Sequence, residues 1–231
     1  MVDVGTNYRS LVERIAIAAA KAGREAQEIR LLAASKSQSV DAIRAALDAG
    51  VTLIGENYVK EAEEKKHQLR NDKVEWHMIG HLQRNKAKLA VDLFEVVESL
   101  DNLALAQELN KEAGRRGKTM RVFIEVNLAH EENKSGIAKA EVAGLLERMV
   151  GLDHVRVEGL MTVPPSRENP EEVRPYFREL RNLRDSLNTL KLPNVRLQEL
   201  SMGMSHDFTV AIEEGATIVR VGTALFGPRV K

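Results

Sequence analysis

The most informative absence in this sequence is cysteine. A chain of 231 residues without cysteine has no disulfide bond, no thiolate nucleophile and no zinc site built on sulfur ligands. Proline and glycine, at 6 and 15 residues, are too few for a low-complexity or collagen-like chain. Hydrophobic residues make up 43% of the chain and charged residues 29%, so a sizeable core is available and disorder is not expected.

An excess of charge of one sign is also lacking. The 34 Lys and Arg residues balance 34 Asp and Glu residues, which argues against broad electrostatic capture of nucleic acid or of an anionic membrane. The longest apolar run near the N-terminus, residues 15–20, lies between Arg14 and Lys21 and is too short for a signal peptide or a membrane span. We therefore expect a cytoplasmic protein that binds neither nucleic acid nor membranes, and whose charged helix surfaces suit a monomer.

Strand and helix signals alternate along almost the whole chain. Short apolar runs predict strands at residues 31–34, 52–54, 74–79, 93–97, 121–126, 155–161, 197–200 and 217–221. Nearly all of them are followed by a segment in which apolar residues have helical spacing. Eight such units, with no linker between them, predict one domain over residues 1–231 that forms a closed TIM-type (β/α)8 barrel.

Capping residues mark where several helices begin or end. Ser39 is expected to be the N-cap of the helix after the first strand. Asp101 is expected to cap a later helix that stops at Gly114, and Asn169 with the proline after it to open another.

Lys36 directly follows the first predicted strand. In parallel barrels the reactive groups lie at the carboxyl ends of the strands, so Lys36 is expected at the barrel mouth. A lysine that is partly desolvated near other cations can form a Schiff base with a carbonyl compound. A lysine that extends from the rim into solvent, or one that binds phosphate, fits this segment as well.

The last two predicted strands are followed by segments that suit an anion. Residues 201–207 (SMGMSHD) lead into a helix, and residues 220–223 (RVGT) follow the eighth strand, so both segments can offer backbone N–H groups. Phosphate sites formed by the loops after strands seven and eight recur in this fold. Each segment alone also fits an ordinary turn, but together they predict a phosphate site.

The six histidines do not form a metal-binding pattern. His77 and His81 are four residues apart, but a strand end is expected between them, so they do not share a helix face. The sequence therefore predicts no metal site.

Six segments of the chain, in order, resemble the pyridoxal phosphate homeostasis protein family. They are LAASK (32–36), GENYVKE (55–61), WHMIGHLQRNK (76–86), GLM (159–161), LSMGMS (200–205) and VRVGT (219–223). The resemblance extends from about residue 31 to the C-terminus. It implies a barrel like the N-terminal domain of alanine racemase, which holds pyridoxal 5′-phosphate as an internal aldimine.

The resemblance also implies a role for individual residues. Lys36 would form the aldimine with the cofactor aldehyde, and Arg220 would face the pyridine nitrogen. The phosphate would be held by Ser201, Gly222 and Thr223 with the help of Ser205, and the ring pocket would be lined by Asn57, His81 and Met161.

The function implied is cofactor binding for intracellular homeostasis, by buffering pyridoxal 5′-phosphate or delivering it to apoenzymes, without significant catalysis. An arginine at the ring nitrogen keeps that nitrogen unprotonated, and the ring is then a poor electron sink. The chain ends at Lys231 without the β domain that supplies a second catalytic base in alanine racemase-like enzymes. A racemase-type enzyme with Lys36 as its sole base is the alternative, and a cofactor-free phosphosugar isomerase that uses Glu56 and His81 is a third.

Overall fold

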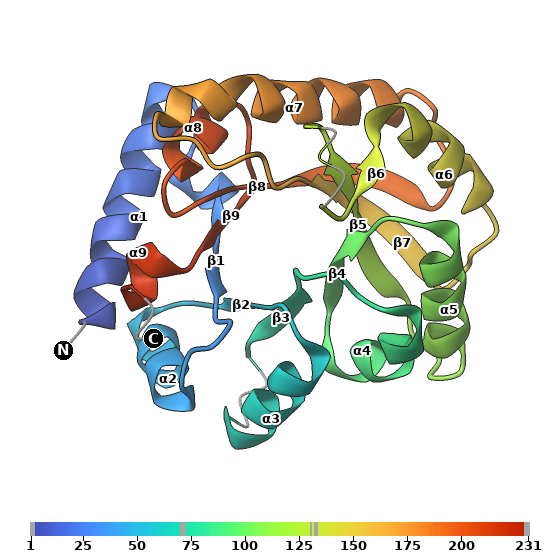
Figure 1. Cartoon of the computed structure of the whole chain (residues 1–231), viewed down its shortest axis with the longest axis horizontal. Helices are drawn as coiled ribbons and strands as arrows, with labels where there is room; N and C mark the ends of the chain where they lie inside the picture. Colours follow the sequence, from blue (N-terminus) through green and yellow to red (C-terminus); the bar gives the residue numbers. More distant parts are fainter. Residues whose placement is uncertain (1–2, 70–72, 130, 132–133, 229–231) are drawn as a thin grey trace.

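Eight parallel strands form a closed barrel, which confirms the predicted (β/α)8 architecture (Figure 1). The computed structural model describes residues 3–69, 73–129, 131 and 134–228. β9 pairs with β1 and β4 pairs with β5, so the ring is complete. In order around the barrel the strands are β1 (Arg30–Ala34), β2 (Leu53–Glu56), β3 (Glu75–Met78), β4 (Val96–Leu100), β5 (Met120–Asn127), β7 (Val155–Met161), β8 (Val195–Met204) and β9 (Ile218–Val221).

Helices surround this ring of strands (Figure 1). The α-helices are α1 (Val4–Lys21), α2 (Val40–Ala49), α3 (Val59–Leu69), α4 (Ala87–Leu93), α5 (Leu103–Gly114), α6 (Val142–Arg148), α7 (Arg174–Asn188), α8 (Phe208–Glu213) and α9 (Thr223–Phe226). Short 3₁₀ turns lie at Ala26–Glu28, Arg84–Lys86, Lys139–Glu141 and Pro170–Val173. A further strand, β6 (Ile137–Ala138), pairs with the end of β5. No helix in the described ranges is both long and apolar enough to cross a lipid bilayer.

The apolar core is divided by the barrel wall. Successive residues of a strand point to opposite sides, so each strand faces the surrounding helices with one set of side chains and the barrel interior with the other. The larger cluster lies between strands and helices. The smaller cluster fills the interior and consists of Leu32, Leu53, Val96, Phe123, Met161 and Ile218.

Two strands differ from the sequence-based expectation. The fourth was predicted at residues 93–97, but Leu93 ends α4 and the strand runs from Val96 to Leu100. The apolar run therefore spans a helix end and a strand start, and the strand continues through Glu98, whose carboxylate is hydrogen-bonded to His77 and Ser201. The seventh was predicted at residues 197–200, but β8 extends from Val195 to Met204.

The additional length of β8 depends on Gly203. Its φ of +90° lies in the left-handed region, and a Cβ atom there would be 2.5 Å from the Cβ of Ala211 in α8. Only glycine therefore allows α8 to pack this closely against the end of the strand.

The helix caps were predicted with one exception. The side chain of Ser39 accepts a hydrogen bond from the backbone N–H of Ala42, and that of Asn169 caps the 3₁₀ turn that precedes α7. The N-cap of α5 is Asn102 and not Asp101, because the Asn102 side chain reaches the N–H of Leu105.

Candidate functional site

Lys36 lies in a turn at the carboxyl end of β1. The turn is closed by a hydrogen bond of 2.9 Å from the N–H of Gln38 to the carbonyl of Ser35. The lysine is half-buried, and its Nζ is 5.3 Å from the centre of the Tyr58 ring, within cation–π range. Among the described residues no carboxylate forms an ion pair with it. The amine is therefore available to a ligand.

A second lysine, Lys65 of α3, holds this turn in place. Its buried Nζ donates to the Ser35 carbonyl at 2.7 Å, to Glu56 at 2.6 Å and to Glu61 at 2.7 Å. The Ser35 hydroxyl donates to the same Glu56 oxygen at 2.5 Å. Burial raises the pKa of the Glu56 carboxyl above its usual range, although hydrogen bonds from Lys65 and Ser35 oppose this rise. Lys65 has three acceptors, so it stabilises the turn and is not a second free amine.

The residue after Lys36 is fixed by the same helix. Ser37 has a φ of +63°, which is uncommon for a residue other than glycine. Its backbone N–H donates to the Glu61 side chain at 2.6 Å. The backbone is therefore held on both sides of Lys36 by groups from α3.

Ser205, just after the end of β8, accepts hydrogen bonds from two backbone donors in the segment after β9. Its Oγ accepts from the N–H of Gly222 at 3.2 Å and from the N–H of Ala224 at 3.1 Å. Thr223, at the start of α9, is exposed. A Cβ atom on Gly222 would lie 3.5 Å from the carbonyl oxygen of Ala34, so this loop packs against the end of β1. Two N–H groups thus converge on one oxygen, an arrangement that also suits an anion.

Arg220 lies inside the barrel and is only 5% exposed. Its Nη1 donates to the carbonyl and to the hydroxyl of Ser201, each at 2.7 Å, and its Nη2 donates to the carbonyl of Thr162 at 2.8 Å. Burial lowers the pKa of this guanidinium, while the carboxylate of Glu98 opposes that effect. Three acceptors therefore fix the direction of the guanidinium.

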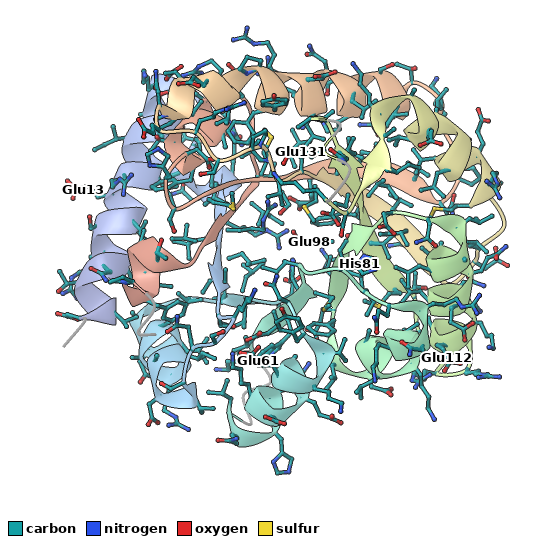
Figure 2. The ribbon with its side chains drawn as sticks, in the orientation of Figure 1. Glu13, Glu61, His81, Glu98, Glu112 and Glu131 are labelled. Carbon is teal, nitrogen blue, oxygen red and sulfur yellow. The ribbon has the colours of Figure 1, made fainter. Side chains whose placement is uncertain are left out.

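A chain of polar side chains continues from Ser201 through the barrel interior. The Ser201 hydroxyl donates to Glu98 at 2.5 Å, and the other oxygen of Glu98 is 2.6 Å from Nδ1 of His77. Nε2 of His77 is 3.1 Å from Glu75. Burial acts to lower the pKa of His77, but hydrogen bonds to these two carboxylates outweigh it and raise the pKa. The two carboxylates therefore favour the protonated form of the imidazole. Figure 2 shows Glu98 within the ring of strands, whereas Glu13 and Glu112 lie outside it.

Glu125 of β5 is a buried carboxyl of a different kind. It is 8% exposed, and within the described ranges no side chain or backbone group donates a hydrogen bond to it. Burial, reinforced by the nearby charge of Asp101, raises its pKa to about 7, although the charge of Arg220 acts in the opposite direction. Its carboxyl can therefore hold or release a proton near neutral pH.

Asn57 and His81 lie at the rim of the barrel. The side chain of His81 is 52% exposed, and its Nδ1 is 3.7 Å from Asp101. A Cβ atom on Gly80 would lie 2.5 Å from the backbone oxygen of Asn57, so glycine is required for the two loops to meet. Here a cavity of about 480 Å³ is lined by Asn57, Tyr58, Val59, Lys60, Met78, Gly80, His81, Leu82, Gln83 and Lys86.

The residues singled out in the sequence occupy three positions around one barrel mouth. Lys36, Asn57 and His81 lie at strand ends on the side of β1 to β3, and the loop residues Ser205, Gly222 and Thr223 lie at the ends of β8 and β9. Met161, Ser201 and Arg220 face the barrel interior, where Met161 belongs to the inner apolar cluster.

Sequence analysis did not identify His77, Glu98 or Glu125 as site residues. Each is a titratable residue within an otherwise apolar strand, and that is the signal that could have found them. No group of three or more His, Asp or Glu side chains suited to a metal ion occurs in the part of the chain that is described.

Comparison with known proteins gives consistent matches. The family described as alanine racemase, N-terminal domain, matches residues 7–230. A pyridoxal phosphate homeostasis protein of Aquifex aeolicus is 48% identical over 219 residues, which are 95% of each chain. A solved structure of PipY from Synechococcus elongatus with pyridoxal 5′-phosphate bound superposes with a TM-score of 0.82 at 36% identity, covering 94% of this chain and 99% of that one.

A further solved structure, of an unknown protein from Bifidobacterium adolescentis, superposes with a TM-score of 0.91 at 37% identity and covers 96% of this chain and 94% of the other. The barrel, the order of its strands and the full-length similarity agree with one another. The chain therefore belongs to the alanine racemase N-terminal domain family and, within it, to the pyridoxal phosphate homeostasis proteins.

Proposed function

We propose that this protein binds pyridoxal 5′-phosphate through Lys36 and serves cofactor homeostasis. The observation that supports this most directly is the arrangement of the mouth, where a lysine without an ion-pair partner and converging backbone donors lie at the adjacent strands β1 and β9. The site suits the cofactor's phosphate because two backbone N–H groups point at one oxygen, that of the Ser205 hydroxyl, and a phosphate oxygen can accept from the same donors. The PLP-bound structure of PipY supports the same ligand.

Each residue has a defined place in this proposal. When bound, the cofactor supplies an aldehyde for a Schiff base with Lys36 and an electron-withdrawing ring. Gly222, Thr223 and Ser205 hold the phosphate, and Arg220 faces the ring nitrogen. Asn57, His81 and Met161 line the ring pocket.

The position of Ser201 refines its expected phosphate contact. Its hydroxyl donates to Glu98 and accepts from Arg220 inside the barrel. We therefore assign Ser201 to the support of Arg220, and a direct phosphate contact by its hydroxyl would require both bonds to break.

The role proposed is that of a carrier that buffers the cofactor or delivers it to apoenzymes, acting as a monomer with residues 1–231 as one cofactor-binding domain. The names of the full-length relatives support homeostasis as the role. A guanidinium at the ring nitrogen disfavours carbanion chemistry, since arginine remains charged.

The binding site is tested by titrating the purified protein with pyridoxal 5′-phosphate. We expect a visible absorption band that borohydride removes, and a mass increase that peptide mapping assigns to Lys36. Lys36→Ala should lose both signals, whereas Lys88→Ala, at an exposed lysine of α4 away from the mouth, should keep them. An adduct at another lysine, or none, would overturn the proposal.

The carrier role is tested separately from binding. Loaded protein incubated with D- or L-alanine in D₂O should exchange the α-hydrogen no faster than free cofactor does. Rapid exchange or racemisation that Lys36→Ala abolishes would identify a racemase-type enzyme instead.

A further inference from the structure

Glu125 is a feature of the mouth that the proposed cofactor binding leaves unexplained. Buried carboxyl groups are ordinarily hydrogen-bonded or paired with a cation, because an isolated charge in a poorly solvated place is costly. Glu125 is only 8% exposed. Among the described residues it has no hydrogen-bond donor and no cation in an ion pair. A ligand that supplies the missing partner would remove this cost.

The strand carrying Glu125 lies across the barrel from Lys36. Three strands separate β1 from β5 in each direction around the ring, so the two strands face one another. Phe123, two residues earlier in β5, belongs to the inner apolar cluster, and alternation places Glu125 on the same interior face but nearer the carboxyl end. Its register partner Met161 also lies inside.

The charges of the mouth are divided between its two sides. Backbone donors and Arg220 lie on the β8–β9 side, where they favour an anion. Glu125 lies on the β4–β5 side with Asp101, whose side chain is 14% exposed and also faces His81, and the charge of Arg220 offsets this negative charge only in part. A cation is therefore favoured on this side, and a carboxylate placed there would be repelled.

We propose that Glu125 binds the primary ammonium of a molecule that enters this mouth and accepts one proton from it. This inference rests on the proposed function, because the amine so formed is the group to which cofactor held by Lys36 would pass. The chemical class is a primary amine without a neighbouring carboxylate, such as a lysine side chain, rather than a free α-amino acid.

The proton balance of this step involves only the ligand and Glu125. The ammonium R–NH₃⁺ gives one proton to the Glu125 carboxylate, which leaves the neutral amine R–NH₂ and the neutral carboxylic acid. An amine with a pKa of about 10.4 is unprotonated in only about one molecule in a thousand at pH 7.4. Only the unprotonated form is a nucleophile, so a carboxylate that first binds the ammonium and then accepts its proton as the amine attacks serves as the general base of the step.

The first test uses protein without cofactor. Side-chain carboxyl resonances of ¹³C-glutamate-labelled protein are titrated with Nα-acetyl-lysine amide or with L-alanine, and Glu125 is assigned by the resonance missing from Glu125→Gln. We expect the lysine derivative to shift this resonance and to lower its apparent pKa, because a bound cation favours the carboxylate. No shift with saturating lysine derivative, or an equal shift with alanine, would overturn the proposal.

The second test follows release of bound cofactor at pH 7.5, by the loss of the protein-bound absorption band after addition of each amine. We expect Nα-acetyl-lysine amide to accelerate release more than alanine does, and Glu125→Gln to reduce this acceleration at least about tenfold. Asp153→Asn, an exposed acid on the other face of the barrel, removes the same charge and should leave release unchanged.

The outcomes separate this inference from the proposed function. If Glu125→Gln still carries a Lys36 adduct but releases cofactor as fast as the unsubstituted protein, the inference alone fails. If Glu125→Gln loses the adduct, the carboxyl belongs to cofactor binding and the inference also fails. Absence of a Lys36 adduct in the unsubstituted protein would overturn the proposed function itself.

Discussion

At the scale of single residues, the titration of Glu125 has a measurable effect on stability. An ordinary glutamate in the unfolded chain ionises near pH 4.5, whereas burial raises the pKa of Glu125 to about 7 in the fold. The stabilising contribution of Glu125 to the free energy of unfolding is therefore fully present below the pKa of the unfolded chain and is lost as the pH rises through about 7. The glutamine of Glu125→Gln stays neutral. The free energy of unfolding of this variant, relative to that of the unsubstituted protein, should therefore rise by up to about 3 kcal/mol between pH 4.5 and pH 8.

Urea denaturation of both proteins across this pH range measures that difference. Parallel stability curves would show that Glu125 titrates at its ordinary pKa in the fold. Because only the difference between the curves is used, titration of the other acidic groups cancels to first order.

Ser205 gives a prediction about the stability of the protein without and with bound cofactor. Ser205→Ala removes the acceptor of two backbone N–H groups, and we expect it to lower the free energy of unfolding of cofactor-free protein by about 1–2 kcal/mol. Saturating cofactor should reduce this difference, because in the proposed binding mode phosphate oxygens would satisfy the same donors. Ser166→Ala, at an exposed serine, is the control. An unchanged difference in both states would place the phosphate elsewhere.

How well a site residue is predicted depends on where its partners lie. Lys36 is found from sequence because a lysine directly after an apolar strand needs no information from elsewhere in the chain. The partners of Glu98 are His77 and Ser201, which are 21 and 103 residues away. No local pattern shows that these side chains face one another, so the interior network emerges only in the fold.

At the scale of elements, the close packing of α8 on β8 depends on Gly203. In Gly203→Ala the new Cβ meets Ala211 at 2.5 Å, and the backbone must hold a φ of +90°. We expect the free energy of unfolding to fall by about 2–3 kcal/mol. Gly144→Ala in α6 adds a Cβ in open space and should raise it by up to about 1 kcal/mol, because alanine is the better helix former. Equal losses in both variants would contradict this packing.

The helix α3 should control the turn that carries Lys36. Lys65→Met leaves Glu56 buried without its cation, so we expect a loss of stability of about 3–5 kcal/mol. The double substitution Lys65→Met with Glu56→Gln removes both charges and should recover part of this loss. Schiff-base formation at Lys36 is measured by absorbance in the same variants. If the double variant recovers stability but not Schiff-base formation, Lys65 is a positioning residue. Full recovery of both would leave it a purely structural one.

Element boundaries were predicted less well than element types. The run from Leu93 to Val97 is uniformly apolar, so its pattern does not show that a helix ends and a strand begins within it. The end of β8 was missed because small residues such as Gly203 indicate a loop, although here they allow close packing. Both differences arise from tertiary contacts that local spacing does not encode.

At the scale of the whole molecule, the barrel closes where β9 meets β1. In the proposed binding mode the cofactor would contact both strands, through Lys36 and the Gly222 loop. We expect bound cofactor to slow hydrogen exchange of the β1 and β9 amides more than that of the β5 and β7 amides. Hydrogen exchange followed by mass spectrometry with and without cofactor measures this. Uniform protection of all strands would indicate a general stabilisation of the fold and not a local stabilisation of the β1–β9 pairing.

The pairing of β1 with β9 also determines when, during synthesis of the chain, the two sides of the proposed site can come together. Lys36 and Arg220 lie on adjacent strands but about 180 residues apart along the chain, so roughly 10–40 seconds of translation separate them. Throughout that interval the nascent polypeptide contains Lys36 but lacks Arg220 and the loop after it. The proposed binding site would thus be assembled late in synthesis, and a ribosome-bound fragment would bind little of the cell's cofactor.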